Sequence, residues 1–255
     1  MQSMSLYVEK DTFVHRIDPI SKIFYIIASI AISFILQTFT ITIICLVINL
    51  ILLLSGRVFK NVLPLIGYSS LVLVTIVIIQ GLFNPGNKTA LFELGPLIFY
   101  TEGLKFAALI CLRVINILCA FSVLILTTRP SNLIEELIRI GVSPKIGYVL
   151  SSVLQIIPQM VSTMGKITDA QRARGMETEG NLFKRIKAFI PLIGPVVMSS
   201  LIQTRERAMA LEVRGFSSPS KRTFFNQRHT HRYGIYIQAL LILVTIAAVV
   251  WRIIE

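Results

Sequence analysis

The amino-acid sequence predicts an all-α membrane protein with about five transmembrane helices, a short helix and two long cytoplasmic helices. Three observations support this fold class. Of the 255 residues, 54% are hydrophobic and 15% are charged, and the mean hydropathy of +0.75 lies far above the range of soluble domains. The apolar residues gather in five segments. Most of the basic residues gather in one long stretch before the last of these segments.

The five apolar segments are long enough, or nearly so, to cross a membrane, because about 20 helical residues span about 30 Å of hydrocarbon. Residues 23–54 form one apolar run that only the mildly polar residues 37–40 interrupt. This pattern predicts two short tilted spans joined by a tight hairpin. The third, fourth and fifth spans are predicted at residues 63–83, 103–128 and 233–254.

The basic residues predict the orientation, since cytoplasmic loops hold an excess of Lys and Arg. Residues 129–232 contain 16 of the 25 basic residues and 7 acidic ones, a local net charge of +9. The loop at residues 84–102 has Lys88 as its one basic residue, and its turn-forming residues predict an ordered loop outside the cell. Arg16 and Lys22 place the N-terminus inside. The expected domains are residues 1–128 in the membrane, 129–232 in the cytoplasm and 233–255 in the membrane.

The cytoplasmic region is predicted to be helical, because its apolar and charged residues recur with helical spacing. A short helix is expected at residues 131–140, with Ser131 as its N-cap. Two long helices are expected at residues 144–174 and 182–214, each on the order of 45 Å in length. The prolines expected to kink the long helices are Pro158, Pro191 and Pro195.

The most specific pattern is a repeat at the ends of the two long helices. Residues 170–175 and 210–215 share Ala-x-x-x-Arg-Gly at an offset of 40 residues. A cation and a glycine at a helix C-terminus are also ordinary capping chemistry, so one copy alone would indicate little. Two copies on consecutive helices in the most basic part of the chain favour a binding function, because each guanidinium can donate a planar fork of hydrogen bonds.

These features resemble the transmembrane T component of energy-coupling factor transporters, the EcfT/CbiQ family, over nearly the whole chain. Besides the repeat, the resemblance is carried by His15-Arg16-Ile17-Asp18-Pro19-Ile20-Ser21-Lys22, Thr127-Thr128-Arg129-Pro130-Ser131-Asn132-Leu133 and Arg139-Ile140-Gly141-Val142-Ser143-Pro144. It implies a multi-pass subunit of the cell membrane that has no catalytic activity and no cofactor. ATP hydrolysis then belongs to partner subunits.

In that family the two long helices are called coupling helices, and their arginines bind grooves in two ABC-type ATPase subunits. A separate substrate-binding subunit, the S component, selects the substrate, which can be a vitamin or a metal ion such as cobalt. The residues that the resemblance places at the ATPase contacts are Ala173, Arg174, Gly175, Val213, Arg214 and Gly215. Val213 departs from the family pattern, which has alanine there. We expect this difference to alter fit in the groove more than charge recognition.

The contact with the S component is expected to involve the apolar middle of the long helices. The candidate residues there are Leu154, Met160 and Met198, although for any one of them a simple core position is the favoured interpretation. Arg113 is the one cation well inside an apolar span, and charges at that depth need a partner. Its two alternative roles are a structural bond to helix-end carbonyls and a contact with the S component.

Three other functions are weighed against this one. A conventional ABC-importer permease has a single coupling loop, which fits the repeat poorly. A lipid-binding scaffold explains the basic surface but not the repeat, although anionic membrane lipids remain expected partners. A membrane enzyme would need a nucleophile and base or a metal cluster. His229 and His231 lie among cations that oppose a metal, and they indicate a basic linker.

Several further classes of function are excluded by composition. The aromatic residues lie inside apolar runs and are not interleaved with the basic residues, so nucleic acid is not an expected partner. Cys45, Cys111 and Cys119 lie in apolar stretches without metal-ligand spacing and are predicted to be small core residues. The sequence has no phosphate-binding loop of the Gly-x-x-x-x-Gly-Lys-Ser/Thr type, and no cleavable signal is expected at its start.

Overall fold

The computed structural model describes residues 7–86, 88–94, 97–175, 182–216, 218 and 234–254. The chain divides into two compact units. Residues 5–141 and 228–255 belong to the first, called the membrane unit here, and residues 142–227 belong to the second, called the helix pair. The predicted domain limits at residues 128 and 232 concern membrane topology and stay a prediction.

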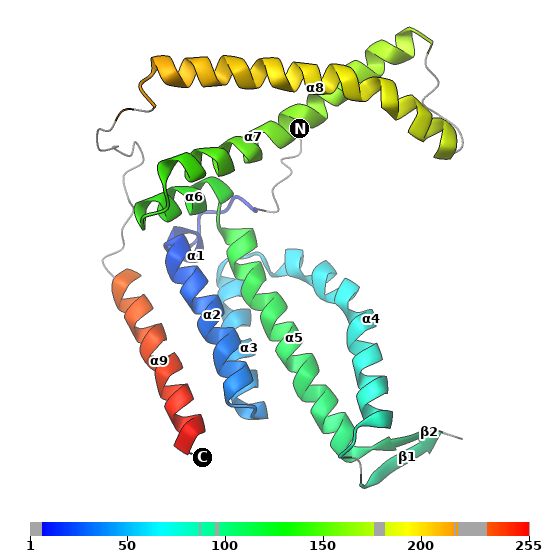
Figure 1. Ribbon diagram of the computed structural model, residues 1–255. Helices are drawn as coiled ribbons and strands as arrows, with labels where there is room; N and C mark the ends of the chain where they lie inside the picture. The colour runs from blue at the N-terminus through cyan, green and yellow to red at the C-terminus, as the bar shows by residue number, and fades with distance from the viewer. Residues whose placement is uncertain are drawn as a thin grey trace. The chain divides into compact units, whose positions relative to one another are not determined.

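The membrane unit is a bundle of helices around α5. Its helices are α1 (Phe13–Arg16), α2 (Pro19–Ile35), α3 (Phe39–Ser55), α4 (Phe59–Phe83), α5 (Thr101–Thr127), α6 (Pro130–Arg139) and α9 (Gly234–Ile254). Figure 1 shows these helices, with α5 beside α2, α3 and α4. The last helix, α9, packs against α2, so helices from both ends of the chain lie together.

The predicted fold class is confirmed: the chain is an all-α membrane protein. Four of the described helices are long and apolar enough to cross a membrane, namely α4, α5, α9 and α7 (Pro144–Ala173). The two helices of the predicted hairpin, α2 and α3, are shorter, with 17 residues each. Tyr233, the predicted first residue of the last span, lies outside the described residues. Because α7 is the least apolar of the four, it remains a predicted cytoplasmic helix.

A small hairpin replaces the loop predicted between the third and fourth spans. Strands β1 (Ala90–Leu94) and β2 (Leu97–Tyr100) pair antiparallel, with Leu94 opposite Leu97. The aromatic and β-branched residues of this stretch favour strands over irregular loop. The turn residues Gly95 and Pro96, which dominate the sequence signal, lie outside the described residues. The prediction of a loop is therefore wrong for the strands.

The short helix begins one residue earlier than predicted. Its first residue is Pro130 and its N-cap is Arg129, which makes no side-chain cap bond, so the prediction of Ser131 as the cap is wrong. Proline suits the first position of a helix because it has no N–H to satisfy and its φ is already helical. In the last turn of the helix, Arg139 Nη2 forms an ion pair with Glu135 Oε1, four residues earlier, at 2.7 Å.

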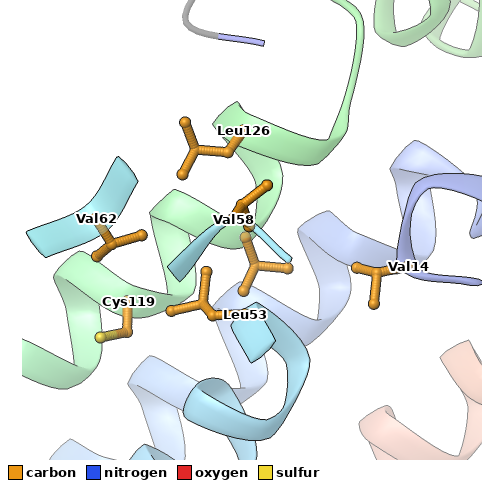
Figure 2. Close-up of a cluster of buried hydrophobic side chains, with 7 residues drawn as sticks. Val14, Leu53, Val58, Val62, Cys119 and Leu126 are labelled. Atoms are coloured by element: carbon orange, nitrogen blue, oxygen red, sulfur yellow. The ribbon is translucent and has the colours of Figure 1, made fainter. Parts of the chain in front are cut away.

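An apolar cluster holds α3, α4 and α5 together near one end of α5. Figure 2 shows this cluster, in which Leu53 and Val58 lie between Val62 and Val14. Cys119 is fully buried in the cluster, which confirms its predicted place in the core. Cys45 and Cys111 are only partly buried. The cluster buries the joint between α3 and α4, so these two helices and α5 pack as one body.

Polar side chains join α2, α3 and α5 inside the bundle. The amide of Asn49 donates to Ser29 Oγ at 3.2 Å and to Asn116 Oδ1 at 2.9 Å, while Tyr25 donates to Asn49 Oδ1 at 2.9 Å. The amide of Asn116 donates to Ser29 Oγ at 3.3 Å. Asn49 and Asn116 are fully buried. Lipid offers no hydrogen bonds, so these polar groups satisfy one another and fix the three helices in register.

The helix pair consists of α7 and α8 (Leu182–Val213), and both long helices are confirmed to within one residue. Ser143 caps α7 by accepting a hydrogen bond from the Ile146 N–H. Figure 1 shows the two helices crossing, and α8 bends within its first half, the half that contains Pro191 and Pro195. This bend agrees with the expected effect of the prolines, because proline removes a helical hydrogen bond.

We expect Asn49→Ala to destabilise the membrane unit more than Tyr25→Phe does. The first change removes the bonds of α3 to both α2 and α5, and the second removes one hydroxyl donor, so costs of about 2 and about 0.6 kcal/mol are expected. Thermal unfolding in mild detergent, followed by the loss of the monodisperse peak in size-exclusion chromatography, measures the order. Equal midpoints for the two variants would contradict a stabilising role for the network.

Candidate functional site

The C-terminal end of α8 is locked by glycine. The N–H of Phe216 donates to the Leu211 carbonyl at 3.0 Å, and the N–H of Gly215 donates to the Glu212 carbonyl at 2.9 Å. Gly215 has a φ of +71°, which is in the left-handed region. This pair of bonds is the Schellman motif, which satisfies the last carbonyls of a helix. Arg214 is therefore held at a defined helix end.

The C-terminal end of α7 shares the left-handed glycine and one of these two bonds. Gly175 has a φ of +85°, and its N–H donates to the Arg172 carbonyl at 2.9 Å. A Cβ at Gly175 or Gly215 would meet no atom within 4 Å, so the backbone conformation, and not a lack of space, requires glycine. The repeat read from the sequence is thus a repeated capping structure that presents an arginine.

The six residues predicted at these helix ends, 173–175 and 213–215, are all exposed. Val213 is 89% exposed, which is unusual for a branched apolar side chain. Within the described part of the chain, neither the Arg174 nor the Arg214 guanidinium has a hydrogen bond or an ion pair. Each end therefore offers a free cation beside a small or apolar residue, which suits recognition by another molecule.

The two helices run antiparallel, so their arginine ends point to opposite sides of the helix pair. Tyr148 near the start of α7 meets Phe216 at the end of α8, with ring centroids 5.1 Å apart and an edge-to-face angle of 61°. Further along, Gln159 donates to Gln203 at 2.9 Å and accepts from Arg207 at 2.7 Å. Figure 1 shows the free ends of α7 and α8 on opposite sides of this crossing.

The separation of the two arginines follows from helix geometry. Arg174 is 15 residues beyond Gln159, and Arg214 is 11 residues beyond Gln203, its bonded partner. At about 1.5 Å per residue these lengths are about 22 Å and about 16 Å on opposite sides of the crossing. The two arginine ends therefore lie on the order of 35 Å apart. Residues 173–175 form one site and residues 213–215 form another, and the two sites are not adjacent.

The apolar residues predicted for the S-component contact lie exposed in the helix pair. Leu154, Met160 and Met198 are exposed, and none of the three belongs to the apolar core. They stand within two apolar stripes with helical spacing, one on each helix. The exposed apolar residues of the stripes are Ile146, Val149, Leu150, Val153, Leu154, Ile157, Met160 and Val161 on α7, and Ile193, Val197, Met198, Leu201 and Ile202 on α8.

Arg113 lies in the membrane unit, apart from the other candidates. Its guanidinium carbon is 5.1 Å from the centroid of the Phe34 ring, a cation–π contact between α5 and α2. Its Nε and Nη2 are buried without a hydrogen-bond partner among the described residues. Of the two alternatives predicted for Arg113, a bond to helix-end carbonyls is not made by these nitrogens.

The sequence did not reveal the role of Lys22, which was interpreted only as a marker of orientation. Lys22 is 4% exposed, and its Nζ donates to the Thr127 carbonyl, Thr127 Oγ1 and Thr128 Oγ1 at 3.0–3.1 Å. These bonds fasten the start of α2 to the end of α5, 105 residues away. A lysine in the first turns of an apolar helix was the available signal, since such a cation needs partners.

The start of α9 is fastened to the same end of α2. Gln238 donates to Ser21 Oγ at 3.1 Å, and Ser21 donates to the Gly234 carbonyl at 3.5 Å. A Cβ at Gly234 would lie 2.5 Å from an Asp18 oxygen, so only glycine allows this approach. The end of α5 and the start of α9 are therefore both bonded to the first turn of α2.

His15 braces the segment before α2. The Thr12 hydroxyl donates to its Nδ1 at 2.7 Å, and its Nε2–H donates to the Val8 carbonyl at 3.0 Å. Burial lowers the pKa of His15 below its usual value, so the neutral ring with a proton on Nε2 is favoured at neutral pH. The described residues contain no group of three or more His, Cys, Asp or Glu that could hold a metal ion. His229 and His231 lie outside the described residues.

Comparison with known proteins gives one consistent family. The family described as "Cobalt transport protein", CbiQ, matches residues 10–225. The energy-coupling factor transporter transmembrane protein EcfT of Lactococcus lactis subsp. cremoris is 31% identical over 98% of this chain and 98% of its own. The EcfT protein of Clostridium kluyveri is 34% identical over 85% of this chain and 84% of its own, and that of Streptococcus equi subsp. equi is 31% identical over 85% and 84%.

We expect Lys22→Met to lower the stability of the membrane unit by about 2–4 kcal/mol, because three acceptors lose a charged donor in a buried site. Thermal unfolding of the purified chain in detergent measures the loss. Lys10→Met is the matched control, since Lys10 makes one exposed bond, to the Arg57 carbonyl. A midpoint for Lys22→Met that equals that of Lys10→Met would refute the role of Lys22.

We expect the Gln159 bonds to set the separation of the helix ends. Spin labels at positions 173 and 213, in a chain with its three cysteines replaced, should give one narrow distance distribution near about 35 Å by double electron–electron resonance. Gln159→Ala should broaden or shift it, whereas Gln155→Ala, an exposed glutamine one turn away, should not. The same narrow distribution in both variants would refute the role of the Gln159 bonds.

Proposed function

The chain belongs to the cobalt transport protein (CbiQ) family and is the transmembrane component of an energy-coupling factor transporter; within that assembly we propose that it is the mechanical coupler. In this proposal the ends of α7 and α8 bind two ABC-type ATPase subunits, and the chain transmits their ATP-driven movement to a substrate-binding S component. The chain itself catalyses no reaction in this proposal.

The observation that carries the proposal is the pair of exposed arginines at glycine-capped helix ends. A guanidinium donates in a planar fork to carboxylates or carbonyls, and the rigid cap fixes where the fork points. Ala173 and Val213 flank the two arginines and differ in bulk, so we expect the two ATPase grooves to hold them with different fit. One long loop with a single motif, as in a conventional permease, would not give two such ends.

The mechanism follows from the antiparallel crossing. Closure of the ATPase dimer upon ATP binding changes the distance between the two grooves, and therefore pulls or pushes on both helix ends. Because α7 and α8 are continuous helices of 30 and 32 residues, a displacement at the ends becomes a change of angle at their crossing. The exposed apolar stripes, with Leu154, Met160 and Met198, move with the helices and are the proposed contact with the S component.

The S component selects the cargo in this proposal, so the uptake of vitamins or metal ions depends on which S component is bound. ATP hydrolysis takes place on the ATPase subunits. The excess of basic residues in residues 129–232 supports a cytoplasmic location of the helix pair and of the N-terminus, in agreement with the side on which ATP is available. Anionic lipid headgroups are the expected neighbours of this basic surface.

Charge reversal at both helix ends tests the proposal. We expect Arg174→Glu combined with Arg214→Glu to reduce co-purification of the ATPases at least about tenfold, because two charge-assisted forks become repulsive. The measurement is the ratio of ATPase to tagged chain after extraction of the membranes in mild detergent.

Two controls accompany this test. Membrane insertion of the double variant is checked by its extraction yield, which should equal that of the wild type. Arg205→Glu reverses an exposed cation on α8 that stands away from the helix end, and it should retain the ATPases. If the double variant retains the ATPases as well, the helix ends are not the binding sites and the proposal fails.

A further inference from the structure

Arg113 is a cation at membrane depth whose hydrogen-bonding capacity is unused. Its residue is partly buried, and its Nε and Nη2 have no partner among the described residues. It stands 12 residues from the start of α5 and 14 from its end, about 18 Å and about 21 Å from the two ends of the helix. An unpaired guanidinium at such a depth is costly, so a partner is expected.

The described spanning helices do not supply the counter-ion. Among the described spanning helices α2, α3, α4, α5 and α9, the one carboxylate is that of Glu102, in the first turn of α5. Glu102 is about 16 Å along the helix from Arg113, and it already accepts from the N–H groups of Lys88 and Thr89. The amide oxygen of Asn116, one turn away, already accepts from Asn49.

The two unsatisfied nitrogens indicate what kind of partner is missing. Nε and Nη2 lie on one side of the guanidinium and together form a fork for the two oxygens of one carboxylate. The same fork is occupied elsewhere in this protein, where Nε and Nη2 of Arg16 donate to the two oxygens of Asp11 at 3.0 Å each. Arg113 has the fork without the carboxylate.

Apolar side chains near Arg113 are exposed on the surface of the membrane unit. Helix α2 ends at Ile35, one residue beyond Phe34. Helix α5 extends a further 12 residues from Arg113 toward its own start at Thr101. Figure 1 shows this part of α5 leaning away from α2 and toward α4. Phe34 is 48% exposed and Phe106, two turns from Arg113 on the same face of α5, is 46% exposed. The cation thus lies at the rim of an apolar surface.

We propose that Arg113 is the anchor for a membrane-spanning helix of the S component, and that an Asp or Glu of that helix binds its Nε and Nη2. This inference rests on the proposed function, because it assigns a second contact to the same S component. The Phe34 ring covers the guanidinium in the unbound chain and turns aside when the carboxylate enters. Phe34 and Phe106 then pack against the apolar face of the incoming helix.

The depth of Arg113 in the membrane favours a carboxylate on a protein helix as its partner over a lipid phosphate. Phosphates lie at the edges of the hydrocarbon, about 15 Å from its centre, whereas Arg113 stands near the middle of α5. A buried pair between spanning helices also gives specificity, since a helix without the acidic residue leaves the cation unpaired. The pair thus explains how the coupler distinguishes S components from other membrane helices.

The test uses the complete transporter, purified through a tag on this chain in mild detergent. Quantitative mass spectrometry gives the ratios of S component and of ATPases to the chain. We expect Arg113→Gln to lower the S-component ratio about tenfold or more and to leave the ATPase ratio unchanged. Arg113→Lys should be intermediate, because an ammonium keeps the charge but not the fork. Arg252→Gln, which removes an exposed cation from α9, is the matched control and should change neither ratio.

A second experiment identifies the partner atom. Each Asp and Glu in the spanning helices of the S component is changed to Arg together with Arg113→Glu, and one combination is expected to restore the S-component ratio. A photo-crosslinking phenylalanine analogue at position 34 should crosslink to the S component, whereas the same analogue at Ile242 on α9 should not.

The inference is overturned if Arg113→Gln keeps the wild-type S-component ratio, or if none of the exchanged charges restores it. It is also overturned if native mass spectrometry shows Arg113→Gln losing a bound phospholipid while the subunit ratio stays unchanged, since the fork would then hold a lipid. Failure of the proposed function appears elsewhere, in the ATPase ratio of the chain with Arg174→Glu and Arg214→Glu.

Discussion

The arrangement of the membrane unit depends on one buried cation. Lys22 holds the start of α2 against the end of α5 through three hydrogen bonds, and the neighbouring Ser21 holds the start of α9. Because Lys22 is 4% exposed, solvent has little access to replace these bonds. The end of α5 and the start of α9 are thus both bonded to the first turn of α2.

The helix pair has the opposite character, with little of its apolar surface covered within its own unit. Most residues of the stripes on α7 and α8 are exposed, and the bonds that hold the crossing involve Gln159, Gln203 and Arg207. Such a pair keeps each helix rigid while leaving the angle between them adjustable. In the proposed mechanism this combination converts ATPase closure into movement, and Arg113 anchors the S component in the part that stays fixed.

Local signals in the sequence predicted the helices well. The bounds of α7 and α8 were predicted to within one residue, because Pro144 and the two Arg-Gly pairs mark helix ends by short-range chemistry. The start of α6 and the β1–β2 hairpin were not, since Ser131 competed with a proline and strand pairing depends on partners. The bonds of Lys22 to Thr127 and the contact of Arg113 with Phe34 join distant segments, and no local pattern encodes them.

Because glycine ends α7 and α8 at defined residues, the length of each helix determines the direction in which its terminal arginine points. One inserted residue turns a terminal arginine by about 100° around the helix axis and advances it by about 1.5 Å. An insertion of seven residues nearly restores its direction but displaces it by about 10 Å. In the proposed coupling role, a length change in either helix would need a matching change in the ATPase groove, so geometry as well as charge would match this chain to its ATPases.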